Sequence, residues 1–229
     1  YENSTATGTE SGGGTIAANQ FAPDAASTLS IGGSFGTLYV GDDVGSAVGS
    51  FDEITDKAEQ GGGGSDAGGD LTSKSVGVKY AVPTGVDGLA LHVGMEMGGS
   101  TTEETSTSFG VQYTFGPATV FYGSDDADDA EQISAYGVSV TQGPVYVAYE
   151  TISNLSGVAA SDDTGLAVVY NYGMGNITYE TNEMKGTGAA EQNAISISYK
   201  LGPVNTYVAS HNDGAGSEDT TSVGVEYAF

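Results

Sequence analysis

Carboxylates are the side chains of this sequence that are best suited to binding chemistry, because they attract cations and can hold Ca²⁺. Eight of them fall within residues 41–73, alongside a single lysine, Lys57. These eight are Asp42, Asp43, Asp52, Glu53, Asp56, Glu59, Asp66 and Asp70. A second acidic group, in residues 124–131, contains Asp125, Asp126, Asp128 and Asp129. Its oxygen-rich composition makes it a candidate Ca²⁺ site, with a solvated acidic loop as the alternative.

Catalytic chemistry has little support in the sequence. His92 and His211 are the only histidines, and neither belongs to a metal-binding or nucleophile motif. The chain has no cysteine and no Gly-x-Ser-x-Gly nucleophile elbow. We therefore expect neither an enzyme nor any cofactor beyond possible Ca²⁺.

The charge balance excludes one class of partner. The 229 residues include 30 Asp+Glu and 5 Lys+Arg, all five of them lysines, for a formal net charge of −25. Nucleic-acid binding depends on clusters of Lys and Arg, so no nucleic-acid partner is expected. Without cysteine, a disulfide scaffold and thiolate metal sites are also excluded.

Strands are the elements that must position these residues, because helical periodicity is almost absent. Within residues 106–115, for example, Phe109, Val111, Tyr113 and Phe115 alternate with small or polar side chains. This alternation predicts a strand that is apolar on one face. Strands are expected near 13–21, 28–40, 74–82, 88–97, 106–115, 118–124, 132–141, 144–152, 164–173, 175–182, 191–201, 203–211 and 220–229. Most approach the 9–11 residues that cross a bilayer at a tilt.

Short and long connections alternate from residue 83 to the end of the chain. The short ones contain Gly and Pro, as in Gly116-Pro117 and Gly143-Pro144, which end a strand ladder. Longer loops rich in acidic or small residues lie between them, at 98–105, 124–131, 153–163, 183–190 and 212–219. A membrane barrel has short turns on one rim and long loops on the other. The alternative is a soluble or surface-layer acidic β-sandwich that binds calcium.

The final strand carries a second membrane signal. Val223, Val225, Tyr227 and Phe229 share one face of residues 220–229. A strand that ends on an aromatic carboxy-terminus resembles the last strand of bacterial outer-membrane barrels, which the assembly machinery reads. By this resemblance, Tyr227 and Phe229 form the assembly signal.

The segment 34–42, Ser-Phe-Gly-Thr-Leu-Tyr-Val-Gly-Asp, resembles the strand before the inward-folded constriction loop of general diffusion porins, particularly the alphaproteobacterial type. The resemblance implies that residues 41–73 are this loop. Eleven predicted strands follow it, as many as would complete a 16-stranded porin. Two precede it where the family has five, so we expect about three N-terminal strands to be missing. A barrel of 12 or 14 strands is the alternative.

The resemblance implies an all-β fold: residues 1–229 as one domain of a transmembrane antiparallel β-barrel, 16-stranded and represented here by about 13 strands. It implies a homotrimer in the bacterial outer membrane, in contact with lipid and lipopolysaccharide, that passively conducts small hydrophilic solutes and ions.

In related porins the acids of the constriction loop face a basic wall. Here the candidates for that wall are Lys79, Lys200 and His92. Rings of acidic side chains favour cations, so we expect cation preference. Asp52, Glu53 and Asp56 are favoured as lining residues because they stand beside Phe51 and Ile54, two apolar side chains that can anchor this segment to the wall. A barrel that serves as anchor or receptor, with a blocked pore, is the remaining alternative.

Overall fold

The computed structural model of the chain describes residues 28–41, 44–51, 54–57, 76–97, 105–127, 131–154, 161–186, 190–212 and 219–227. Across these ranges the fold is all-β, with thirteen strands and one short 3₁₀ helix. The elements are β1 (Thr28–Gly33), β2 (Gly36–Gly41), η1 (Val48–Ser50), β3 (Val76–Ala81), β4 (Leu89–Met97), β5 (Ser106–Phe115), β6 (Ala118–Ala127), β7 (Ile133–Gln142), β8 (Val145–Ser153), β9 (Asp163–Asn171), β10 (Asn176–Met184), β11 (Ala190–Leu201), β12 (Val204–Asn212) and β13 (Thr220–Tyr227). Over the same ranges, no helix has the length and apolar character needed to cross a membrane.

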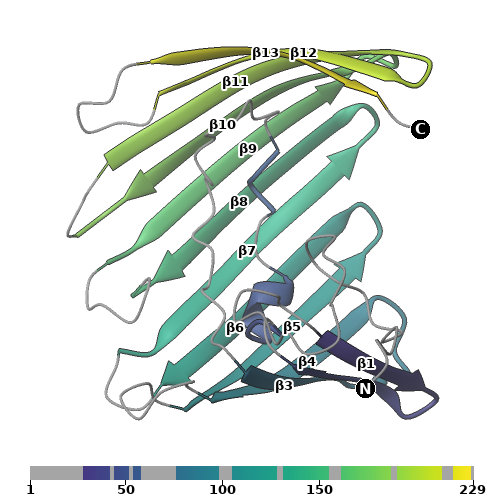
Figure 1. The fold of residues 1–229 in the computed structure, drawn as a ribbon, viewed down its shortest axis with the longest axis vertical. Coiled ribbons are helices and arrows are strands. Elements are labelled where there is room, and N and C mark those ends of the chain that lie inside the picture. Colours follow the sequence, from purple (N-terminus) through teal and green to yellow (C-terminus); the bar gives the residue numbers. More distant parts are fainter. Residues whose placement is uncertain are drawn as a thin grey trace, which may run out of the picture.

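The strands form one antiparallel sheet in which each strand pairs with the next in sequence. Strands β1 and β13 are its two edges, so the sheet is not closed over the described residues. Figure 1 shows that both ends of the sheet curl toward the same side, and that η1 lies on this side. We call it the concave face and the opposite side the convex face. A β-sandwich needs two packed sheets, so this single sheet does not support that alternative.

The strand predictions hold best after residue 73. Eleven strands were expected there, and β3 to β13 are eleven. The single strand predicted at 28–40 is wrong, because Ser34 and Phe35 form a turn between β1 and β2. Gly36 ends this turn with a φ of 103°, a backbone angle that glycine tolerates best. The strand predicted at 13–21 lies outside the described residues.

The convex face carries the large apolar side chains. Val147 is 40% exposed, Ile197 51% and Val223 76%, while the alternate residues Ala148 and Ser196 are buried on the concave face. This distribution is the reverse of a soluble protein, in which the apolar side of a sheet is buried. It is the arrangement of a barrel wall, whose outward side meets lipid.

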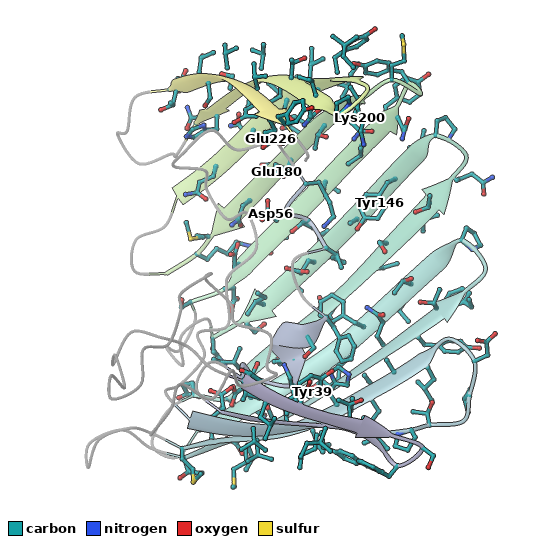
Figure 2. The ribbon with its side chains drawn as sticks, turned by 45° about the vertical axis from the view of Figure 1, so that its right-hand side comes forward. Tyr39, Asp56, Tyr146, Glu180, Lys200 and Glu226 are labelled. Atoms are coloured by element: carbon teal, nitrogen blue, oxygen red, sulfur yellow. The ribbon has the colours of Figure 1, made fainter. Side chains whose placement is uncertain are left out.

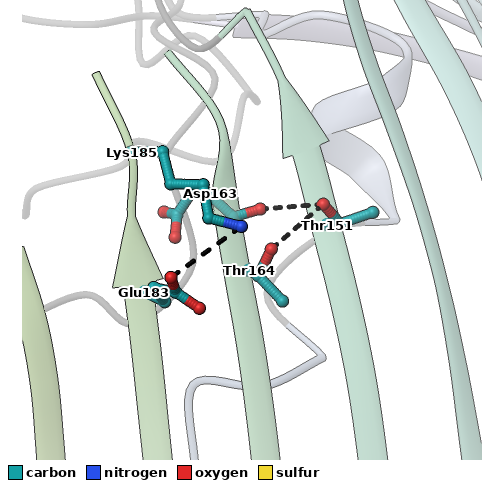
Figure 3. A network of polar contacts seen from close by, with 5 residues as sticks. All are labelled: Thr151, Asp163, Thr164, Glu183 and Lys185. Atoms are coloured by element: carbon teal, nitrogen blue, oxygen red, sulfur yellow. Dashed lines mark hydrogen bonds and ion pairs between the residues drawn. The ribbon is translucent and has the colours of Figure 1, made fainter. Parts of the chain in front are cut away.

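Polar contacts mark one border of this apolar face, at the long-loop ends of β8, β9 and β10 (Figure 3). The Thr151 hydroxyl donates to the backbone carbonyl of Asp163 at 3.0 Å and lies 3.3 Å from the Thr164 hydroxyl. Lys185 and Glu183 form a 3.8 Å ion pair, which is solvent-exposed and therefore stabilises little. Tyr136, the register partner of Thr151, is 51% exposed on the same convex face.

Candidate functional site

Residues 44–57, as far as they are described, lie against the concave face. We call residues 44–51 and 54–57 the inner segment. The Ala47 backbone N–H donates to the Ser108 hydroxyl of β5 at 2.8 Å. Within the segment, the Ser46 hydroxyl accepts from the Gly49 N–H at 3.0 Å, which steadies the start of η1. The start of the inner segment is therefore hydrogen-bonded to the wall at β5.

An apolar cluster attaches the inner segment to the sheet. Val48 and Phe51 are 0% and 6% exposed. They pack with wall side chains of β6, β7 and β8, namely Phe121, Ala135 and Ile152. Burial of one such large side chain stabilises by about 1.5–3 kcal/mol. The hydrophobic core of this sheet thus lies where the inner segment meets the wall.

Two wall carboxylates and one tyrosine hold the second half of the inner segment (Figure 2). Glu150 of β8 accepts from the Ile54 N–H at 3.3 Å, and Glu180 of β10 accepts from the Lys57 N–H at 2.8 Å. The Tyr146 hydroxyl donates to the Ile54 carbonyl at 2.7 Å. Hydrogen bonds to charged groups are stronger than neutral ones, so these carboxylates are effective anchors.

Asp56 is the one predicted loop acid that lies in the described residues. It is partly exposed and sits in the middle of the concave face, in the same region as Glu180 (Figure 2). The other seven lie outside the described residues: Asp42, Asp43, Asp52, Glu53, Glu59, Asp66 and Asp70. Their pore-lining role stays a prediction, as does the narrowing of a pore by residues 41–73.

The three candidate basic residues occupy two separate places. Lys79 of β3 lies over the Tyr39 ring, with its Nζ 5.7 Å from the ring centroid, a cation–π distance. His92 of β4 packs on the Phe51 ring at 4.7 Å and is therefore partly covered by the inner segment. Lys200 of β11 is near the other end of the sheet, beside a cavity of about 490 Å³ that Asn205 and Glu226 also line. The structure does not gather the three into one cluster.

The buried wall acids were not among the predicted site residues. Glu96, Glu150 and Glu180 are each at most 2% exposed, on β4, β8 and β10. The alternation along each strand carried a usable signal, because each of these glutamates occupies a position on the polar side of its strand. A second signal came from Phe121 and Ile152, because these apolar side chains occupy positions on the polar side of their strands.

The acidic run 124–131 differs from its prediction as a loop, because β6 continues to Ala127. Asp125 is 8% exposed while Asp126 is exposed, since neighbouring residues of a strand point to opposite faces. Asp128 and Asp129 lie outside the described residues. Among the residues that the structure places, no group of three or more His, Cys, Asp or Glu could hold a metal ion. Ca²⁺ binding here remains a prediction.

Of the predicted assembly signal, Tyr227 ends β13 and is 55% exposed, in the outward set with Val223 and Val225. Phe229 lies outside the described residues.

Comparison with known proteins decides the family. A family profile described as Gram-negative porin matches residues 2–229. This chain belongs to the Gram-negative porin family. The porin is therefore a channel protein of the bacterial outer membrane. A sequence search of curated proteins finds no match.

Solved structures agree with this fold. Two mutants of the Rhodobacter blastica porin align with TM-scores of 0.69 and 0.70 at 18% identity, covering 89% of this chain and 77% of theirs. A porin structure refined at 1.8 Å aligns with a TM-score of 0.64, also at 18% identity, covering 89% of this chain and 81% of that one. At this identity the likeness establishes the porin fold alone.

Proposed function

We propose that this porin is a passive, water-filled channel for small hydrophilic solutes and ions, and that it prefers cations. Residues 41–73 narrow the channel, and their acids act together with those of the wall. Solutes cross by diffusion. The opening beside the inner segment selects them by size, and the acidic side chains around it select them by charge.

The observation that carries the cation preference is the charge of the concave face. Within the described residues its acids are Asp56, Glu96, Asp125, Glu150, Asp163, Glu180 and Glu226. The lysines on the same side are Lys57, Lys79 and Lys200. An excess of carboxylates along a pore lowers the energy of a cation in it and raises that of an anion. Because the chain contains no arginine, this excess has few counter-charges.

The test is the reversal potential of the purified porin in a planar bilayer under a KCl gradient. We expect a sign that reports cations as the main carriers. Neutralisation of Asp52, Glu53 and Asp56 together should move the potential toward zero. Neutralisation of Glu150 and Glu180 by Gln should do the same, since Gln removes the charge and keeps a hydrogen-bond acceptor.

Glu183→Gln is the matched control, because Glu183 is an exposed carboxylate on the convex side of β10. It should leave the reversal potential at the wild-type value. An anion-leaning wild type would contradict the cation preference. Unchanged potentials in both neutralised variants would place the selecting charges elsewhere.

We further propose a homotrimer in contact with outer-membrane lipid and lipopolysaccharide, on the strength of the family. Chemical cross-linking in native membranes followed by denaturing electrophoresis tests it. A ladder that ends at three subunits supports the trimer, and a monomer band alone contradicts it.

A further inference from the structure

Four glycines of the wall lie under Ala47, Val48, Phe51 and Ile54 of the inner segment, one on each of four consecutive strands. They are Gly94 of β4, Gly110 of β5, Gly123 of β6 and Gly137 of β7. Gly110 and Gly123 are direct register partners. We propose that these glycines form a seat that fixes how deeply the inner segment lies, and thereby set the open cross-section of the channel. This inference rests on the proposed channel.

The backbone does not require glycine at these positions. None of the four has a positive φ, so each lies in an ordinary strand conformation that any residue adopts. Glycine in a strand interior weakens the strand by about 0.5–1 kcal/mol relative to alanine. It marks places where another backbone or a ligand approaches closely. Here the close neighbour is the inner segment.

Gly110 and Gly123 show the approach most clearly. A Cβ at Gly123 would lie 2.5 Å from Val48 Cγ2 and 2.6 Å from Val48 Cβ, and 2.7 Å from the Phe109 carbonyl oxygen of β5. A Cβ at Gly110 would lie 2.6 Å from the Ala47 carbonyl oxygen and 2.7 Å from Phe51 Cδ2. Val48 Cβ and the Ala47 carbonyl are tied to the backbone of the inner segment, so a rotamer change cannot relieve these contacts.

The other two glycines bound the seat on either side. A Cβ at Gly137 would lie 2.4 Å from Phe121 Cε1 of the wall and 2.7 Å from Ile54 Cδ1, and one at Gly94 would lie 3.4 Å from the Ala47 nitrogen. The Ser108 hydroxyl, which binds that nitrogen, stands 2.7 Å from the same Gly94 position. The seat thus follows the described residues of the inner segment from Ala47 to Ile54. Gly77 of β3 continues the row, because a Cβ there would lie 3.3 Å from Val44 Cβ.

Added methyl groups at the seat should narrow the channel. Carbon atoms pack at about 3.5–4.0 Å, so a contact of 2.5 Å must open by about 1 Å. The wall strands are paired on both sides, whereas the inner segment has the lumen on its free side. The inner segment should therefore rise into the lumen and reduce the cross-section there.

The experiment measures the single-channel conductance of Gly110→Ala and Gly123→Ala in planar bilayers. Gly32→Ala is the control, because a Cβ there meets nothing closer than the Thr37 hydroxyl at 3.3 Å. We expect a conductance below wild type in both seat variants and an unchanged value in the control. Adding Val48→Gly to Gly123→Ala removes the two colliding atoms of Val48 and leaves the 2.7 Å contact with the Phe109 carbonyl oxygen, so it should restore part of the lost conductance.

Failure of the glycine seat can be distinguished from failure of the proposed channel function. A wild-type protein without conductance fails as a channel. A conducting wild type with seat variants at or above its conductance overturns the seat alone. If Gly123→Ala does not fold, the double variant decides. A double variant that folds and conducts supports the seat. If it does not fold either, the remaining 2.7 Å contact with the Phe109 carbonyl accounts for the failure, and Gly110→Ala decides, because the three nearest contacts of a Cβ there are all in the inner segment. A Gly110→Ala protein that conducts at or above wild type overturns the seat.

Discussion

Removal of the Glu180 carboxylate should loosen the second half of the inner segment. Glu180 is 1% exposed and accepts the Lys57 N–H at 2.8 Å. A hydrogen bond to a charged group contributes about 1.5–3 kcal/mol net. Since every 1.4 kcal/mol is a factor of ten, loss of this bond should raise the open population of the Lys57 amide by about 10- to 150-fold. Because the donor residue, Lys57, is solvent-exposed, we expect an acceleration at the lower end of this range.

Hydrogen–deuterium exchange of the refolded porin measures this population. Glu180→Ala should accelerate exchange at Lys57 by about tenfold. Glu180→Gln should accelerate it less, because the amide oxygen still accepts a hydrogen bond. Both variants should lose the same charge and therefore shift the reversal potential alike. The pair of variants thus separates anchoring from charge.

Glu183→Ala is the control for this prediction, because Glu183 is on the same strand but on the convex side and solvent-exposed. It should leave exchange at Lys57 unchanged. Equal exchange in wild type and Glu180→Ala would refute the anchoring role of the carboxylate.

Three further perturbations have defined outcomes. Tyr146→Phe removes the 2.7 Å bond to the inner segment, worth about 1 kcal/mol, and should raise exchange there about fivefold; an unchanged rate contradicts this. Gly224→Ala places a Cβ 2.1 Å from the Tyr207 ring and should lower unfolding free energy in urea by about 1–3 kcal/mol, with relief when Tyr207→Ala is added. Val147→Lys on the convex face should cost about 2–4 kcal/mol of stability in vesicles, and Glu183→Lys, at the exposed long-loop end of the same face, about 0–1; equal costs would argue against lipid at Val147.

The sheet was predictable because its signal is local. Alternation with period two fixes strand and facing residue by residue, and residues 106–115 were predicted with the bounds that β5 has. The failure at 28–40 came from the same signal. Alternating apolar residues continue on both sides of the turn, and the positive φ of Gly36 is invisible to periodicity.

The site was less predictable because its contacts are not local. The bond from Ile54 to Glu150 joins residues 96 apart, and that from Lys57 to Glu180 joins residues 123 apart. Nothing in the spacing of acids at 41–73 indicates which wall residues accept from that segment. The anchoring role of Phe51 and Ile54 was predicted and is confirmed, because both side chains pack in the apolar cluster between the inner segment and the wall. Apolar side chains in an acidic loop need a surface to bury against.

The central claim is that the concave face lines a water-filled channel while the convex face meets lipid. Successive residues of β7 test it, because Ser139 belongs to the concave set and Val138 is 39% exposed on the convex face. The chain has no cysteine, so Ser139→Cys and Val138→Cys each carry one thiol. A charged, water-soluble thiol reagent should lower the conductance of Ser139→Cys in a planar bilayer and leave Val138→Cys unchanged. A conductance block at Val138→Cys with none at Ser139→Cys would contradict the account.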